Sequence, residues 1–152
     1  MRFGTPDPAT RQHATIRVRG EDTGGRLALV ETVEVRGAES PCHRHHWEDE
    51  VIYVVTGELA VCVGGTWITA PSSTTVLVPR CVEHGFTVLS ETATILTAFA
   101  PAGFEGFYRE NDAAPWASDT SIAIERLLAT AARYGCDITG PRFDPPGFRS
   151  ER

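Results

Sequence analysis

Four residues of this sequence carry side chains that bind transition metals, and their spacing allows them to meet. His43 and His45 are two residues apart, and on an extended strand such residues project from the same face. Glu50 comes five residues later, at the start of an apolar run, so a short hairpin can bring it beside them. His84 lies 84 − 50 = 34 residues beyond Glu50 and can join only through the tertiary fold. The sequence therefore predicts a site of three imidazoles and one carboxylate.

This donor set suits one divalent transition metal, which could be Fe, Mn, Ni, Co, Cu or Zn. A magnesium or calcium site would use mostly oxygen, and a structural zinc site would more often be closed by cysteine sulfur. Four protein ligands leave one or two positions open on a five- or six-coordinate metal, as catalysis requires. Because the imidazoles must be neutral to bind, we expect metal affinity to weaken below about pH 6.

Neighbouring residues offer alternatives to parts of this set. Glu48 and Asp49 compete with Glu50, but the apolar strand begins at Glu50 and the spacing therefore favours it. His46 follows His45 directly and so points to the opposite face, where solvent exposure or a hydrogen bond to a ligand is the better interpretation. The run HRHHWEDE is hydrophilic as a whole, so an ordinary surface loop is the alternative to a metal site.

The cysteines and the charge limit the compartment and the partners. Cys42 and Cys81 flank the ligand segments, so a sulfur ligand stays open, although buried reduced cysteines that pack as small apolar residues are commoner. No CxxC pair and no signal-like apolar N-terminus occur, which predicts reduced thiols in a cytoplasmic protein. The net charge of −6 argues against nucleic acid and anionic membranes as partners, and no apolar run approaches the ~18 residues of a membrane span. We expect a small-molecule substrate.

Short β-like runs separated by turn residues fill the chain from residue 15 to about 100. They cover 15–19, 27–35, 50–55, 58–63, 66–69, 74–79, 85–89 and 92–100. Gly64 and Gly65 are suited to a two-residue hairpin turn. So many strands without a helix between them exclude a βαβ architecture and favour a closed or sandwiched antiparallel barrel, and their spacing suits a small barrel with room for one ligand.

The two ends of the chain differ from this barrel region. Apolar residues at helical spacing predict a helix over 119–135, with Ser118 or Asp119 as its N-cap and Gly135 ending it in a left-handed conformation. The stretch between the barrel and this helix is loop-like. We therefore divide the chain into an N-terminal arm (1–14), the barrel with its following loop (15–118), a C-terminal helix (119–135) and an irregular tail (136–152).

Two of the strands have apolar residues with further candidate roles. If Glu50 and His84 point into the barrel, four apolar side chains share their faces and either line a substrate pocket around the metal or form ordinary core. These are Ile52, Val54, Phe86 and Val88. The opposite face of the strand that begins at Glu50 is also apolar, at Val51, Tyr53 and Val55. This second apolar face predicts another buried contact, and we expect it to be the interface of a homodimer.

The run 37–57 resembles the first motif of the cupin superfamily, G(X)5HXH(X)3–4E(X)6G, at every fixed position. The segment 79–84 looks like the centre of the second motif, G(X)5PXG(X)2H(X)3N, where the proline and the histidine match. Cys81 stands in place of the motif glycine and Val88 in place of the asparagine. Neither departure removes a metal ligand, and we expect them to alter the turn before His84 and the pocket wall beyond it.

The resemblance covers roughly residues 27–100, and a similarity to single-domain cupins related to quercetin 2,3-dioxygenase extends onward through PAGFEGFYRE and a helix ending ARYG. It implies an all-β fold, a double-stranded β-helix or jelly-roll barrel that often dimerises, with a short C-terminal helix. It implies His43, His45, Glu50 and His84 as the metal ligands. In oxygenases of that kind the glutamate both binds the metal and acts as a base on a substrate hydroxyl, a role that can be carried only onto Glu50.

Three functions agree with these residues. The first is a dioxygenase acting on an enolic, phenolic or polyketide-like molecule, and the second is a non-redox metal-dependent cyclase, isomerase or decarboxylase. The same four residues serve both, so the identity of the metal and oxygen consumption are needed to separate them. The third is a non-catalytic barrel that binds or senses a small molecule.

Overall fold

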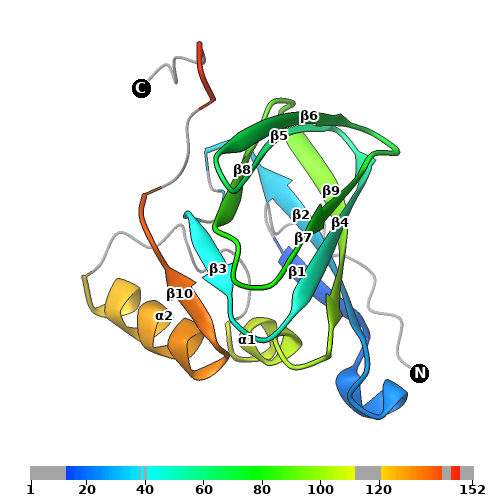
Figure 1. Cartoon of the computed structure of the whole chain (residues 1–152), viewed down its shortest axis with the longest axis vertical. Helices are drawn as coiled ribbons and strands as arrows, with labels where there is room; N and C mark the ends of the chain where they lie inside the picture. Colours follow the sequence, from blue (N-terminus) through cyan, green and yellow to red (C-terminus); the bar gives the residue numbers. More distant parts are fainter. Residues whose placement is uncertain (1–12, 38, 40, 112–120, 142–144, 148–152) are drawn as a thin grey trace.

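Two antiparallel sheets of five strands each face one another and form a barrel (Figure 1). The computed structural model describes residues 13–37, 39, 41–111, 121–141 and 145–147. In spatial order, the first sheet contains β1 (His13–Val18), β2 (Ala28–Val35), β9 (Thr92–Ala100), β4 (Asp49–Thr56) and β7 (Thr75–Val78). The second contains β10 (Cys136–Ile138), β3 (His43–His45), β8 (His84–Val88), β5 (Glu58–Val63) and β6 (Thr66–Pro71). The predicted all-β jelly-roll barrel is confirmed.

Side chains alternate between the interior and the exterior of the barrel along the long strands. On β2, every second residue from Ala28 to Glu34 is buried, and the residues between them are partly exposed. β9 repeats the pattern, and its buried Phe99 pairs with Ala28 on one side and with Glu50 on the other. This period of two is the one expected for strands that have one face in a core.

Two clusters of buried apolar side chains stabilise the fold. The first consists of Ile52, Val54, Leu59, Val61, Ala70, Val76, Val78, Val88, Ala93 and Ile95 from the strands. The second joins the strands to the helices and consists of Val30, Phe99, Phe104, Phe107, Leu127, Ala131 and Cys136. Because Phe99 pairs with Glu50 in the strand ladder, the second cluster lies directly beside the candidate site.

Glycines form two turns that no other residue could form without strain. Gly64 and Gly65 join β5 to β6 with φ angles of 56° and 84°, the conformation of the predicted two-residue hairpin. Gly57, between β4 and β5, has a φ of 86°, and a Cβ on it would lie 2.5 Å from the carbonyl oxygen of Thr92. A side chain at position 57 would therefore collide with backbone.

The predicted C-terminal helix is present as α2 (Ser121–Arg133). Gly135 follows it with a φ of 69°, the left-handed conformation expected after a helix end. The helix buries Leu127 and Ala131, whereas Ile124 stays 46% exposed. The expected N-caps lie outside the described residues. Within those residues, no helix is long and apolar enough to cross a membrane.

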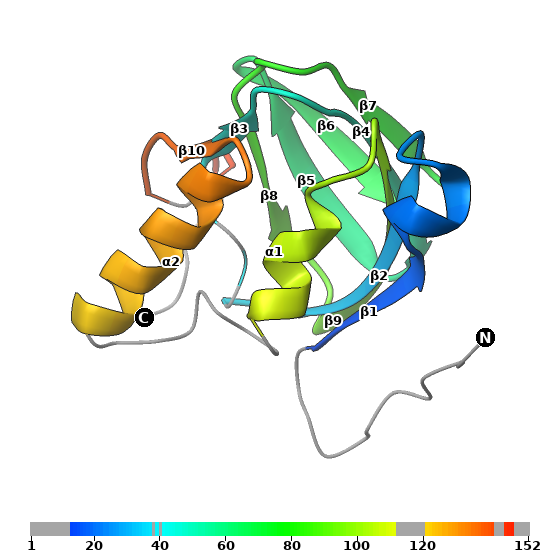
Figure 2. The same ribbon diagram turned by 90° about the horizontal axis from the view of Figure 1, so that it is seen from below.

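A second helix, α1 (Glu105–Glu110), forms where we expected a loop. Its glycines made it a poor helix by propensity, but packing overrides them: Phe104 and Phe107, three residues apart, are both buried. The buried Glu105 carboxylate accepts the backbone N–H groups of Gly103 at 2.6 Å and Gly20 at 3.0 Å. α1 contacts α2, β1 and β2, so it lies beside the barrel rather than in solvent (Figure 2).

Two further differences from the expected elements involve short segments. Residues 136–138, expected in an irregular tail, form β10 because they pair with β3 along its whole length. The expected turn after the first strand contains a 3-10 helix, Gly20–Thr23. β1 begins at His13, and the rest of the expected N-terminal arm lies outside the described residues.

Candidate metal centre

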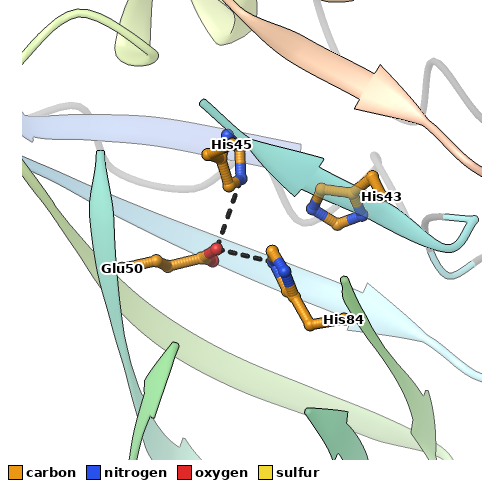
Figure 3. A group of neighbouring side chains, drawn as sticks. All are labelled: His43, His45, Glu50 and His84. Carbon is orange, nitrogen blue, oxygen red and sulfur yellow. Dashed lines mark ion pairs between the residues drawn. The ribbon is translucent and has the colours of Figure 1, made fainter. Parts of the chain in front are cut away.

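The four predicted ligands come from both sheets of the barrel. His43 and His45 lie on β3 and His84 on β8, and His43 pairs with His84 across these two strands. Glu50 lies on β4, which belongs to the opposite sheet. The short hairpin that we expected between β3 and β4 is therefore wrong: residues 46–48 cross from one sheet to the other, and the carboxylate faces the imidazoles across the barrel (Figure 3).

The ligand atoms of these residues converge on one point. One nitrogen from each histidine and one Glu50 oxygen all lie within 4.8 Å of one another. Glu50 Oε2 is 2.8 Å from His84 Nε2 and 3.3 Å from His45 Nε2 (Figure 3). Two ligands at about 2.1 Å from one metal are roughly 3.0 Å apart at a right angle and roughly 4.2 Å apart in line. The observed cluster is therefore close to the size of a coordination shell.

Two of the converging atoms, Glu50 Oε2 and His84 Nε2, are buried without hydrogen-bond partners among the described residues, a state that a metal would satisfy. His45, Glu50 and His84 are only 2%, 7% and 1% exposed. Among the described residues, Glu50 Oε2 and His84 Nε2 have no partner of hydrogen-bonding geometry, although they lie 2.8 Å apart. Both atoms belong to the group of ligand atoms that lie within 4.8 Å of one another. Leaving such buried groups unpaired is unfavourable, so the four residues fit a divalent transition metal.

Backbone carbonyls fix the orientation of two of the imidazoles. His43 Nδ1 lies 2.8 Å from the Pro41 oxygen, and His84 Nδ1 lies 3.0 Å from the Val82 oxygen. A carbonyl can only accept a hydrogen bond, so Nδ1 carries the proton in both rings and Nε2 keeps its lone pair for the site. His45 differs, because its Nδ1 is buried without a hydrogen-bond partner in the described part of the chain.

Glu50 and His84 stabilise each other's charged form. Burial would raise the pKa of Glu50, but the neighbouring His84 and His45 outweigh it and hold that pKa well below its usual range. Burial would lower the pKa of His84, but the Glu50 carboxylate outweighs it and the pKa rises. Burial, together with the charges of His84 and His45, lowers the pKa of His43 to about 3. His43 is therefore neutral, and ready to bind a metal, at any ordinary pH.

Comparison with known proteins agrees with this fold. The cupin domain family matches residues 29–99, which include all four ligands. The chain contains a cupin domain. Solved structures with the same fold include KdgF from a Halomonas species, with a TM-score of 0.55 and 23% identity over 63% of this chain and 84% of that one. Proteins with curated descriptions include no match to this sequence.

Two further structures extend the comparison. An RmlC-like cupin from Shewanella frigidimarina has a TM-score of 0.53 and 24% identity over 66% of this chain and 85% of that one. A recombinant oxalate oxidase in complex with glycolate has a TM-score of 0.51 and 18% identity over 66% of this chain and 56% of that one. At these identities the similarity establishes the fold and not the reaction.

The turn before His84 has a left-handed backbone at the position where the motif has glycine. Cys81 occupies the motif glycine position with a φ of 66°, in the left-handed region that glycine prefers. Its N–H donates to the carbonyl of His45 at 2.7 Å, which links the end of β3 to the turn that precedes β8. The thiol of Cys81 is exposed and the thiol of Cys42 is buried, and neither belongs to the candidate ligand group. At the motif asparagine position, the fully buried Val88 donates its N–H to Glu39 Oε1 at 2.9 Å.

Three polar residues next to the candidate ligands, His46, Asp49 and Glu48, lie outside the group whose ligand atoms converge. His46 is exposed and lies 2.7 Å from the Asp137 carboxylate, on the face opposite the ligands as predicted. Asp49 lies 3.0 Å from Arg80 in a surface ion pair. Glu48 is 2% exposed, which the hydrophilic run around it did not predict. Burial raises the pKa of Glu48 although the charge of His45 opposes it, and its Oε2 has no hydrogen-bond partner among the described residues.

Of the four apolar residues expected near the metal, Phe86 differs from the others. Ile52, Val54 and Val88 are at most 2% exposed and belong to the first core cluster, whereas Phe86 is partly exposed and packs against it. A substrate pocket that includes these residues stays a prediction. On the outer face of β4, Tyr53 remains 36% exposed. The homodimer expected from that face also stays a prediction.

An aromatic layer behind His45 was not predicted. The Phe104 ring meets the His45 ring edge-on, with 4.3 Å between centroids, and Phe99 is 5.5 Å away. The Tyr108 ring lies 5.7 Å from Phe104. Burial raises the pKa of Tyr108 well above its usual range, and the nearby Glu50 carboxylate adds to this, so the phenol stays neutral. The sequence signal was the aromatic run FEGFY, whose spacing suits a helix face.

Proposed function

We propose that this protein is a metal-dependent cupin enzyme that acts on a small enolic, phenolic or polyketide-like molecule, and that its reaction is a dioxygenation. The observation that carries the proposal is that one ligand atom from each of three histidines and Glu50 lies within 4.8 Å of the others, with Glu50 Oε2 and His84 Nε2 buried there without hydrogen-bond partners among the described residues. Four protein ligands leave one or two positions on a five- or six-coordinate metal for a substrate. This arrangement is more typical of catalysis than of a closed structural site.

Partial exposure at one side of the site supports access by a small molecule. His43 is the most exposed of the four ligands, while the other three are buried. Val63 pairs with His84 across β5 and β8, and Val61 pairs in the same ladder with Phe86. Val63 and Phe86 are only partly buried. We infer that the substrate reaches the metal past His43, with Val63 and Phe86 contacting its apolar part.

The chain's own residues supply binding and proton transfer. Bound there, a divalent transition metal would supply a Lewis acid that lowers the pKa of a substrate hydroxyl and, in the dioxygenase, a centre for dioxygen. Glu50 is ionised in the metal-free protein, so it can accept a proton when the substrate binds. Its lowered pKa makes it a weak base, which suits it only to a hydroxyl that is itself acidified. His43 stays neutral and keeps its ring fixed through Pro41.

The test combines metal analysis with oxygen uptake. Protein purified without added metal is analysed for its metal content, then reloaded separately with Fe²⁺, Mn²⁺, Ni²⁺ and Zn²⁺ and assayed against a panel of enolic and phenolic compounds. The proposal predicts stoichiometric oxygen consumption with a redox-active metal, and its loss in the His84→Ala variant. Turnover with Zn²⁺ and no oxygen uptake would instead identify a non-redox cyclase, isomerase or decarboxylase. Binding without turnover would identify a sensing or carrier protein.

The free thiols and an exposed apolar patch support two further parts of the proposal, a reducing compartment and a homodimer. All four cysteines are free, which supports a reducing compartment such as the cytoplasm. The outer face of the first sheet carries the exposed apolar side chains of Tyr53, Val55 and Leu77. Patches of this kind support a protein partner, and we propose a second copy of the chain. Sedimentation equilibrium of the wild type and of a Leu77→Glu variant tests this assignment.

A further inference from the structure

The three histidines of the site are not held in the same way. The Nδ1–H groups of His43 and His84 each donate to a backbone carbonyl two residues earlier in the chain. His45 is 2% exposed, and its Nδ1 has no hydrogen-bond partner within the described residues. Metal-binding histidines nearly always donate their second nitrogen to an oxygen, because this fixes the tautomer and the ring orientation. His45 therefore needs an acceptor that the backbone does not provide.

Glu48 is the residue whose position and chemistry meet this need. It is 2% exposed, its Oε2 has no hydrogen-bond partner among the described residues, and it lies close enough to His45 for their charges to interact. A Cβ on Gly103 would lie 3.3 Å from Glu48 Oε1, and the next residue, Phe104, packs edge-on against the His45 ring. The Glu48 carboxyl group and the His45 ring thus both lie beside residues 103–104.

Glu48 cannot take the role of a metal ligand itself. His45 turns Nε2 toward Glu50, at 3.3 Å, so Nδ1 faces away from the position of the metal. Glu48 is also absent from the group of residues whose ligand atoms converge. A buried carboxylate outside that group can influence the metal only through one of its ligands, and His45 is the ligand whose Nδ1 is unpaired among the described residues.

We propose that Glu48 is the positioning residue for His45, with its carboxyl group accepting the Nδ1–H of that ring when the site is assembled. In the structure each of the two atoms lacks a hydrogen-bond partner among the described residues and the two residues form no ion pair, so the proposal requires a rotation of the Glu48 side chain toward the ring. A carboxylate acceptor makes the imidazole a stronger donor to the metal than a carbonyl does. His45 is then the most strongly donating histidine of the three. This inference rests on the proposed metal centre.

The experiment compares Glu48→Ala and Glu48→Gln with the wild type, and Glu105→Gln is the matched control. Glu105 is a second buried carboxylate of the same region, but its oxygens are bonded to the N–H groups of Gly20 and Gly103. Zn²⁺ affinity is measured by chelator competition, with circular dichroism as a check of folding. We expect Glu48→Ala to weaken binding roughly 10- to 100-fold, Glu48→Gln to weaken it less because its amide oxygen still accepts the N–H, and Glu105→Gln to bind as the wild type does.

Nitrogen-15 NMR of the imidazoles provides a readout that a general loss of packing would not give. In metal-free wild-type protein we expect His45 to carry its proton on Nδ1 with a downfield-shifted signal, and Glu48→Ala to remove that shift while the signals of His43 and His84 stay in place. Unchanged His45 signals, or equal losses of affinity in Glu48→Ala and Glu105→Gln, would overturn the proposal. Wild-type protein that binds no Zn²⁺ would instead refute the metal centre, and the NMR comparison would still decide the pairing.

Discussion

Replacing Cys81 by glycine should stabilise this cupin, because the backbone at position 81 has the conformation that glycine prefers. Its φ of 66° lies in the left-handed region. A residue with a Cβ costs roughly 1–2 kcal/mol there. Glycine removes that cost, but its greater freedom in the unfolded chain opposes the gain by roughly 0.5–1 kcal/mol. The difference leaves a net stabilisation of about 0.5–1 kcal/mol.

The thiol contributes little that the substitution would lose. Cys81 is exposed, and its Sγ lies 3.7 Å from the carbonyl of His46, a weak contact for sulfur. The N–H that donates to the His45 carbonyl is retained in glycine. For a chain of 152 residues, the expected gain corresponds to a rise in Tm of about 1–4 °C. Zn²⁺ affinity should stay unchanged, because the turn before His84 keeps its shape.

Urea denaturation of the metal-free protein measures the effect, and Cys81→Ala separates the backbone from the thiol. Alanine keeps the Cβ and therefore the strain, so its midpoint should stay at or slightly below that of the wild type. Ser73→Gly tests the same backbone argument at a second site, because Ser73 has a φ of 68° at an exposed turn. If Cys81→Gly were no more stable than Cys81→Ala, the strain argument for this turn would be wrong.

Three further results are expected. His84→Ala should lose most of its bound metal while the barrel folds, and full occupancy by elemental analysis would contradict the ligand assignment. Since Glu50 raises the pKa of His84 above 6.5 and the metal needs the neutral ring, lowering the pH should begin to weaken metal binding while the pH is still above 6.5, by up to tenfold per pH unit below that pKa. Equal affinities at pH 7.5 and 6 in a competition titration would refute this. Gly106→Ala should lower the free energy of unfolding by about 1–3 kcal/mol, because its Cβ would lie 2.4 Å from the Tyr134 ring. An unchanged urea midpoint would exclude that contact.

The sequence predicted the parts of the fold that depend on local pattern. The strand runs and the two-residue turn at Gly64 follow from alternation and glycine chemistry, and both are confirmed. α1 and β10 could not be predicted in this way, because each exists through contacts with distant residues. Glu105 reaches back to Gly20, and Cys136 pairs with His45. Local propensity does not contain those contacts.

The candidate site was predictable to a similar degree. The spacing of His43, His45 and Glu50 and the match of His84 to the second motif identified all four candidate ligands, and the structure brings their ligand atoms within 4.8 Å of one another. Glu48 was not predictable as a buried residue, because nothing in a hydrophilic run tells which carboxylate turns inward. Its burial is decided by the crossing of residues 46–48 between the two sheets, a feature of the tertiary fold alone.

The pairing of β3 also sets when the site can assemble during synthesis of the chain. All three residues of β3 pair with β10, whereas His43 with His84 is the one register pair that joins β3 to β8. The partner of His45 is Cys136, which the ribosome adds 136 − 45 = 91 residues later. At 5–20 residues per second, His45 waits roughly 5 to 18 seconds for that partner. A nascent chain therefore exposes these candidate metal-binding side chains before the strand that pairs with β3 exists, and we expect metal loading to follow the synthesis of residues 136–138.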